Sequence, residues 1–139
     1  MSTSQAGAGS RTWGETVALI LGIVYVAVGL LGFAVTGGVG FAATEGKTLL
    51  GIFELNPLHN LVHLAIGAAL LLGYAAGRKA AGGIALAIGV VYLVVGVLGF
   101  FVENSSANIL AVNLADHLLH LGSGAVLVAA GLNASRSSA

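Results

Sequence analysis

All four histidines lie in two related segments, NPLHNLVHL and NLADHLLHL, near the start of two apolar stretches. His59 and His63 are four residues apart, and so are Asp116 and His120, so each pair shares one face of a helix. Paired ligands at this spacing on facing helices are a common way to hold a divalent ion. The pattern predicts a metal site of His59, His63, Asp116 and His120, with His117 as an alternate ligand, for zinc, copper or iron.

Two other interpretations of these residues stay open. His63 and His120 lie about 10 Å below the starts of their helices, at a depth where polar groups face a bundle interior. They could serve as the two axial ligands of a haem, or take part in a proton relay. The other interpretation is structural: Asn56 and Asn113 cap two helices, and the histidines form hydrogen bonds across a bundle.

The elements that must position these side chains are apolar helices. Hydrophobic residues make up 58% of the 139 residues and charged residues only 7%, against about 25% charged in a soluble domain. There is no cysteine, which excludes disulfides and thiolate ligands. Four stretches approach the roughly 20 residues that cross a bilayer as a helix. They span residues 15–35, 58–76, 80–102 and 114–132.

These helices form two similar pairs. GIVYVAVGLLGF, starting at Gly22, returns as GVVYLVVGVLGF at Gly89, and the histidine segments align in the same order. The sequence therefore predicts an all-α integral membrane four-helix bundle, built from two tandem two-helix repeats in parallel orientation. The expected divisions are a mobile tail (1–12), a first repeat (13–77) with an outer loop at about 36–55, a second repeat (78–132) and a second tail (133–139).

The distribution of basic residues predicts the orientation. Of the five, only Lys47 falls on the side of the outer loops, and Arg11, Arg78, Lys79 and Arg136 fall on the other. The positive-inside rule then places both termini in the cytoplasm of a multi-pass protein of the plasma membrane. The net charge of zero gives no reason to expect nucleic acid as a partner. The lipid bilayer is the expected partner, and the glycine-bearing helices offer a surface for homo-oligomers or for a larger membrane complex.

The outer loop contains LLGIFEL, an amphipathic piece that we expect at the membrane interface or over the mouth of the bundle. With NPLHNLVHL directly after it, this segment resembles a family of small four-helix bacterial membrane proteins, mainly actinobacterial, described as a domain of unknown function. The resemblance covers residues 13–132. It implies a four-helix membrane protein and supplies no activity.

No catalytic motif is recognisable, so we predict no catalytic residue and do not expect an enzyme. The sequence predicts a non-catalytic accessory or oligomeric membrane module with an outward-facing His/Asp metal site. The alternative is a bis-histidine haem protein with a redox role, or a small transporter or proton relay.

Overall fold

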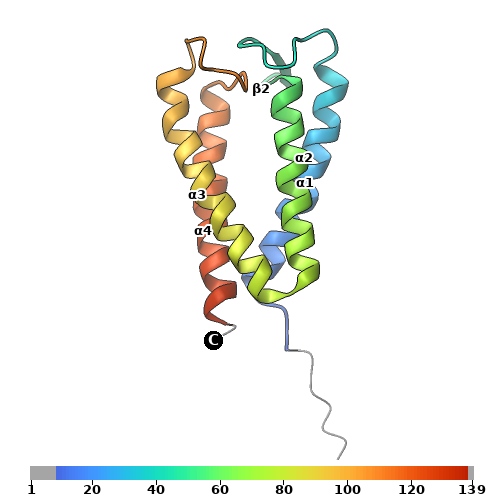
Figure 1. The fold of residues 1–139 in the computed structure, drawn as a ribbon, viewed down its shortest axis with the longest axis vertical. Helices are drawn as coiled ribbons and strands as arrows, with labels where there is room; N and C mark the ends of the chain where they lie inside the picture. Colours follow the sequence, from blue (N-terminus) through green and yellow to red (C-terminus); the bar gives the residue numbers. More distant parts are fainter. Residues whose placement is uncertain (1–8, 138–139) are drawn as a thin grey trace, which may run out of the picture.

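Four long helices and one β-hairpin make up the fold (Figure 1). The structure is a computed structural model, and it describes residues 9–137. The elements in chain order are α1 (Trp13–Val35), β1 (Lys47–Leu49), β2 (Phe53–Leu55), α2 (Pro57–Ala76), α3 (Arg78–Val102) and α4 (Leu114–Arg136). Each helix is long and apolar enough to cross a membrane, which confirms the predicted four-helix membrane bundle.

The ends of the chain differ from the expected tails. The tails at 1–12 and 133–139 lie partly outside the described residues. Within the described part, α4 continues to Arg136, beyond the expected end at Leu132. Thr12 belongs to α1 as its N-cap, because its hydroxyl accepts a hydrogen bond from the backbone N–H of Glu15 at 3.1 Å and the Glu15 carboxylate accepts one from the Thr12 N–H.

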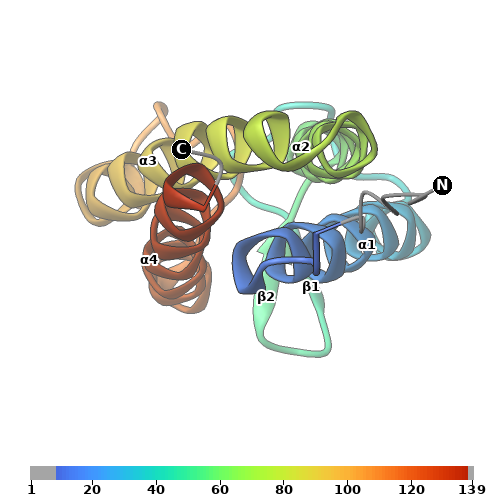
Figure 2. The ribbon, with the colours of Figure 1, turned by 90° about the horizontal axis from the view of Figure 1, so that it is seen from below.

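The helices pack most closely within the pairs α1–α2 and α3–α4. The two pairs lie closest to each other near the α2–α3 turn and diverge toward the other end (Figure 1), and from below α1 lies beside α4 (Figure 2). The short turn depends on Gly77, whose φ of 115° is a conformation that favours glycine. The diverging end therefore leaves space between the pairs for large side chains.

Small residues bring the backbones of each pair together. A Cβ on Gly67 of α2 would lie 2.7 Å from the backbone nitrogen of Val26 in α1, and one on Gly89 of α3 would meet α4 as closely. Inside the bundle, three glycines of α1 contact α2 and three of α3 contact α4, namely Gly22, Gly29, Gly32, Gly89, Gly96 and Gly99. The glycine-bearing surfaces that the sequence suggested for association with a second copy therefore pack within one chain.

A hydrogen-bonded network ties the ends of the chain to the α2–α3 turn. The guanidinium of Arg78 donates to the Glu15 carboxylate at 3.1 Å and to the backbone carbonyls of Ser10 and Ser137 at 2.9 and 3.0 Å. The backbone N–H of Gly14 also donates to the Asn133 side chain at 2.9 Å. Both termini and the short turn therefore lie at one end, which we call the inner end.

The β-hairpin lies at the opposite, outer end and covers α1 and α4 there (Figure 1, Figure 2). Lys47 pairs with Leu55 in an antiparallel register, and both central residues of the turn, Leu50 and Gly51, have positive φ. The backbone N–H of Ile52 donates to the carbonyl of Leu49 at 3.2 Å, so Leu49–Ile52 forms a β-turn within a three-residue loop between the paired residues Leu49 and Phe53. LLGIFEL therefore packs over the mouth of the bundle. The sequence did not predict that it forms strands, because Leu-Gly at the turn lacks the usual Asn-Gly signal.

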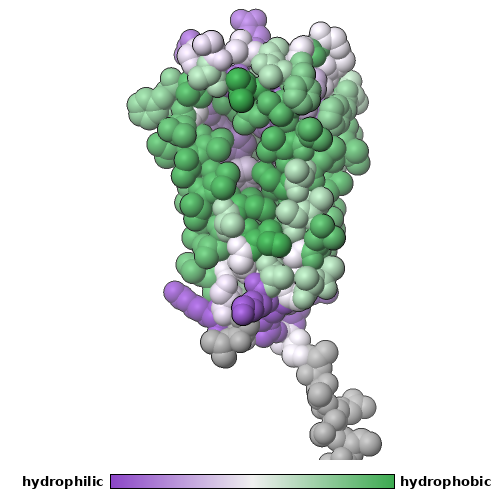
Figure 3. Space-filling model, viewed as in Figure 1, coloured by the Kyte–Doolittle hydropathy of each residue, from purple (hydrophilic) through white to green (hydrophobic). Residues whose placement is uncertain are grey.

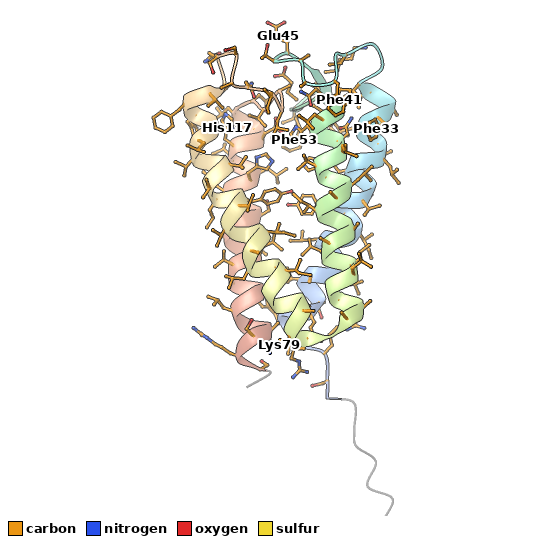
Figure 4. All side chains as sticks on the ribbon, viewed as in Figure 1. Phe33, Phe41, Glu45, Phe53, Lys79 and His117 are labelled. Atoms are coloured by element: carbon orange, nitrogen blue, oxygen red, sulfur yellow. The ribbon has the colours of Figure 1, made fainter. Side chains whose placement is uncertain are left out.

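On the face seen in Figure 3, apolar side chains form a band between hydrophilic ends. Glu45 lies at the outer end and Lys79 at the inner end (Figure 4). Large apolar side chains are exposed along the whole band, among them Ile20, Leu31, Leu72, Val91 and Leu118. This surface suits lipid, since an apolar surface this extensive is rare on a soluble monomer.

We expect Gly89→Ala to destabilise the bundle by about 1–3 kcal/mol, as overpacking does. The added Cβ would lie 2.7 Å from the backbone nitrogen of Val128 and 2.9 Å from the carbonyl oxygen of Gly124, and backbone atoms cannot move aside cheaply. Gly83 on the same helix is the control, because a Cβ there would meet nothing within 4 Å. Unfolding in mixed micelles with rising SDS, followed by circular dichroism, measures both. Equal midpoints for the two variants would contradict the packing argument.

Candidate metal centre

Three histidines from two helices meet between the helix pairs near the outer end. His59 and His63 lie one turn apart on α2, and His120 reaches them from α4. Their ring centroids are 4.4 Å apart for His59 and His63, 5.8 Å for His59 and His120, and 6.4 Å for His63 and His120. One nitrogen from each ring lies within 4.8 Å of the other two. We call these three residues the histidine cluster.

The rings of the cluster are removed from solvent. Only 1% of His59, 6% of His63 and 4% of His120 is accessible. Both ring nitrogens of His59 lack a hydrogen bond of good geometry, although the backbone of Glu54 and Leu110 lies close to its ring. The Nδ1 atoms of His63 and His120 are also buried without a partner. Buried polar groups without partners are costly, so the cluster is suited to a ligand that accepts nitrogen lone pairs.

A small contraction would complete a metal site. Imidazole nitrogens bind zinc at about 2.0–2.1 Å, which places the ligands of a tetrahedral ion about 3.3 Å from one another. The longest nitrogen separation in the cluster, at most 4.8 Å, would shorten by about 1.5 Å on ion binding. Rotation of the side chains can supply a movement of this size.

Two tyrosines lie next to the cluster on its inner side. The Tyr92 ring stacks on His120 with centroids 5.0 Å apart and planes 25° apart, and Tyr25 lies 5.6 Å from His63 and 5.4 Å from Tyr92. The buried hydroxyl of Tyr92 has no hydrogen-bond partner among the described residues. The histidine spacing did not predict these tyrosines as part of the site. Their repetition in GIVY and GVVY, one helix before each histidine segment, is the signal that could have identified them.

Asp116, which the sequence predicted as a fourth ligand, lies beside the histidine cluster and outside it. Its Oδ2 atom accepts hydrogen bonds from the backbone N–H groups of Asn113 at 3.0 Å and Glu54 at 3.2 Å. The carboxylate thus caps α4 and attaches β2 to it. Asp116 also lines a cavity of about 100 Å³ together with His63 and His120, so it faces the cluster across a space.

His117 points away from the cluster. Its Nε2 atom lies 3.0 Å from the Glu103 carboxylate (Figure 4 labels His117). Its ring packs over Gly99, and its centroid lies 4.8 Å from that of the Phe100 ring. Asn60, the matching residue of the first half, packs over Gly32 in the same way. Both side chains connect the two helices of one pair, and the structure gives His117 a position outside the cluster.

Asn56 and Asn113 start the helices that carry the cluster. Each side-chain oxygen accepts a hydrogen bond from a backbone N–H in the first turn, His59 at 2.8 Å and Asp116 at 3.1 Å. The amide of Asn56 also donates to the carbonyls of Ala43 and Ile109, at 2.8 and 2.7 Å. One buried residue therefore connects α2 to both outer loops and sets the position of His59.

The space around the cluster is small. Besides the cavity at Asp116, a second cavity of about 40 Å³ lies on the other side, lined by all three histidines and by Tyr92. Hydrophilic atoms are visible between the helix pairs near the outer end (Figure 3). Pockets for drug-sized ligands hold about 300–1,000 Å³. The arrangement therefore suits a single ion and a few small molecules better than a macrocycle between His63 and His120.

The chain belongs to the family described as domain of unknown function DUF4383, whose model matches residues 15–133. The match covers all four helices up to the last turn of α4, and it includes the histidine cluster. No curated protein and no solved structure matches the chain.

We expect Asn56→Ala to lower the stability of the protein more than Asn113→Ala does. Loss of a cap costs about 1 kcal/mol in either variant. Each variant also loses hydrogen bonds from the amide, but the one from Asn113 to the Ile52 carbonyl is exposed to water. Asn56→Ala leaves the partly buried carbonyls of Ala43 and Ile109 without theirs, which raises its cost to about 2–4 kcal/mol. Thermal unfolding in detergent measures the difference. If Asn113→Ala were the more damaging variant, the central role of Asn56 would be wrong.

Proposed function

We propose that this member of the DUF4383 family is a membrane protein that binds one divalent transition-metal ion through His59, His63 and His120. The observation that carries the proposal is the burial of three imidazoles whose nitrogens come within 4.8 Å of one another while His59 has no hydrogen bond of good geometry. His117, outside the cluster, pairs its Nε2 atom with the Glu103 carboxylate and leaves its Nδ1 atom without a partner. His59 differs from it because neither of its ring nitrogens has a hydrogen bond of good geometry.

The ligand set favours zinc, with copper or iron as alternatives. Imidazole binds all three metals, and three neutral imidazoles on rigid helices are a familiar zinc arrangement. The ion would bring two positive charges into an apolar bundle, and Asp116 provides a negative charge across the adjoining cavity. A haem on His63 and His120 would need a slot between rings whose centroids are 6.4 Å apart.

The metal would lie on the outward side of the plasma membrane. Arg78 contacts Ser10 and Ser137 at the inner end, and Lys79 lies at that end too (Figure 4). The positive-inside rule assigns this end, with both termini, to the cytoplasm. The histidine cluster lies at the opposite end, so its ion would come from outside the cell.

We further propose that the protein works as an accessory or oligomeric module in the membrane, without catalysis of its own. The repeated glycines Gly22, Gly29 and Gly32 of α1, and Gly89, Gly96 and Gly99 of α3, contact α2 and α4. A second copy or another membrane protein would therefore associate with the exposed apolar band instead. Long, exposed side chains such as Phe101 and Leu72, 80% and 71% accessible, form part of that band.

Elemental analysis of the purified protein tests the proposal. After removal of any affinity tag, we expect close to one equivalent of metal, and at least a tenfold weaker affinity in His63→Ala and His120→Ala, because each variant removes one of three ligands. His117→Ala is the matched control, since it deletes a buried histidine outside the cluster. It should keep its metal.

Size-exclusion chromatography in detergent confirms that each variant is folded, and visible absorption tests haem in the same samples. A wild-type protein with far less than one equivalent, also after incubation with zinc, would overturn the metal proposal. A Soret band lost in His63→Ala and His120→Ala would replace it with the haem alternative.

A further inference from the structure

The larger of the two cavities beside the histidine cluster has one polar wall. It holds about 100 Å³ and is lined by His63, His120 and Asp116, with the rest of its lining apolar. The apolar residues come from α1, the hairpin and α4: Val28, Leu49, Leu50, Phe53, Leu55 and Leu119. The hairpin thus forms the outer wall of a space that reaches two of the three proposed metal ligands.

One oxygen of the Asp116 carboxylate has no hydrogen bond to the described residues. Its Oδ2 atom accepts both of the carboxylate's hydrogen bonds, from the backbone of Asn113 and Glu54. Its Oδ1 atom accepts none from the described residues. A carboxylate can accept about four hydrogen bonds, so Asp116 can hold the hairpin and at the same time accept a proton donor from the cavity.

Three histidines would leave a tetrahedral ion with one position unfilled. Structural zinc sites are closed by four protein ligands, and sites with three protein ligands keep the fourth for water or another small molecule. His63 and His120 line both cavities, so an ion bound to them would lie between the two spaces. Of these spaces, only the larger one includes a carboxylate in its lining.

We propose that the fourth position of the metal opens into the cavity at Asp116 and takes a small exogenous ligand. In the resting protein this ligand is water, which donates a hydrogen bond to Oδ1 of Asp116. The proposal rests on the metal site proposed above and adds an exchangeable position to it. A space of about 100 Å³ holds about three water molecules, at about 30 Å³ each. It therefore selects water and ligands of two or three heavy atoms.

Cobalt-loaded protein makes the fourth position visible, because the visible bands of four-coordinate Co²⁺ change when a ligand is exchanged. We expect azide, a three-atom anion, to change the spectrum of the wild-type protein in a saturable way. Val28→Phe should bind cobalt normally and lose the response, because the larger side chain fills the cavity from α1. Val24→Phe is the matched control: it lies one turn earlier on the same helix, is 43% accessible and lines no cavity near the cluster.

Asp116→Asn tests the role of the carboxylate. The amide oxygen can still accept the hydrogen bonds from Asn113 and Glu54, so the hairpin remains attached. Loss of the negative charge should strengthen azide binding about tenfold or more, because a buried like charge repels an anion strongly. An unchanged azide affinity in Asp116→Asn would show that Asp116 does not face the fourth position.

The two proposals fail in different ways. Protein that takes up no cobalt overturns the metal site itself. Protein that holds one equivalent of cobalt, with a spectrum insensitive to azide, keeps the metal site and overturns the open position. A response in Val28→Phe equal to that of the wild type would also overturn it, because the ligand would then enter by another route.

Discussion

The outer half of this protein is organised by the need to satisfy polar groups in a bundle that faces lipid. Lipid offers no hydrogen bonds, so each buried polar side chain must find its partner inside the protein. Asn56 meets this need with backbone partners. Asn60 and His117 meet it in part, because each pairs one polar atom and leaves a second one buried without a partner. The histidine cluster is the place where buried nitrogens converge and remain unpaired. The same constraint that shapes the rest of the outer end is the reason to propose a ligand at the cluster.

Close packing within the helix pairs determines where such a site can form. Glycines let α1 approach α2, and α3 approach α4, so little room remains inside either pair for a polar cluster. Between the pairs, the inner end is filled by small and aliphatic residues such as Ala18, Ala85 and Leu127. Toward the outer end the pairs diverge, and tyrosine and histidine rings take the place of the aliphatic side chains. The β-hairpin then closes the space from above.

Much of this architecture could be predicted from the sequence, because apolar length and period determine membrane helices directly. The caps at Asn56 and Asn113, and the shared face of His59 and His63, follow from local spacing of the same kind. The rotation of each helix about its axis in the bundle does not follow from local spacing. His117 and His120 are three residues apart on α4, yet one faces Glu103 and the other faces α2. The His117 ring is held away from the cluster by its packing over Gly99 and by its contact with Glu103, and local spacing predicts neither. The hairpin was not predicted because Leu50 has a positive φ in its turn, a conformation that a leucine does not signal in a sequence.

The difference between the two halves explains why a site of this kind would be open to an additional ligand. The alignment of the histidine segments matches His63 with His120, and His59 with Asp116. A histidine at position 116 would add a fourth imidazole, and four protein ligands leave a tetrahedral ion closed. An aspartate side chain is shorter than a histidine side chain. Here one of its oxygens accepts hydrogen bonds from the hairpin and from the start of α4. It therefore stays back from the cluster and leaves a cavity between itself and the imidazoles. The difference between His59 and Asp116 in the two matching segments would thus leave the proposed site with three imidazoles, a free position and a hydrogen-bond acceptor beside it.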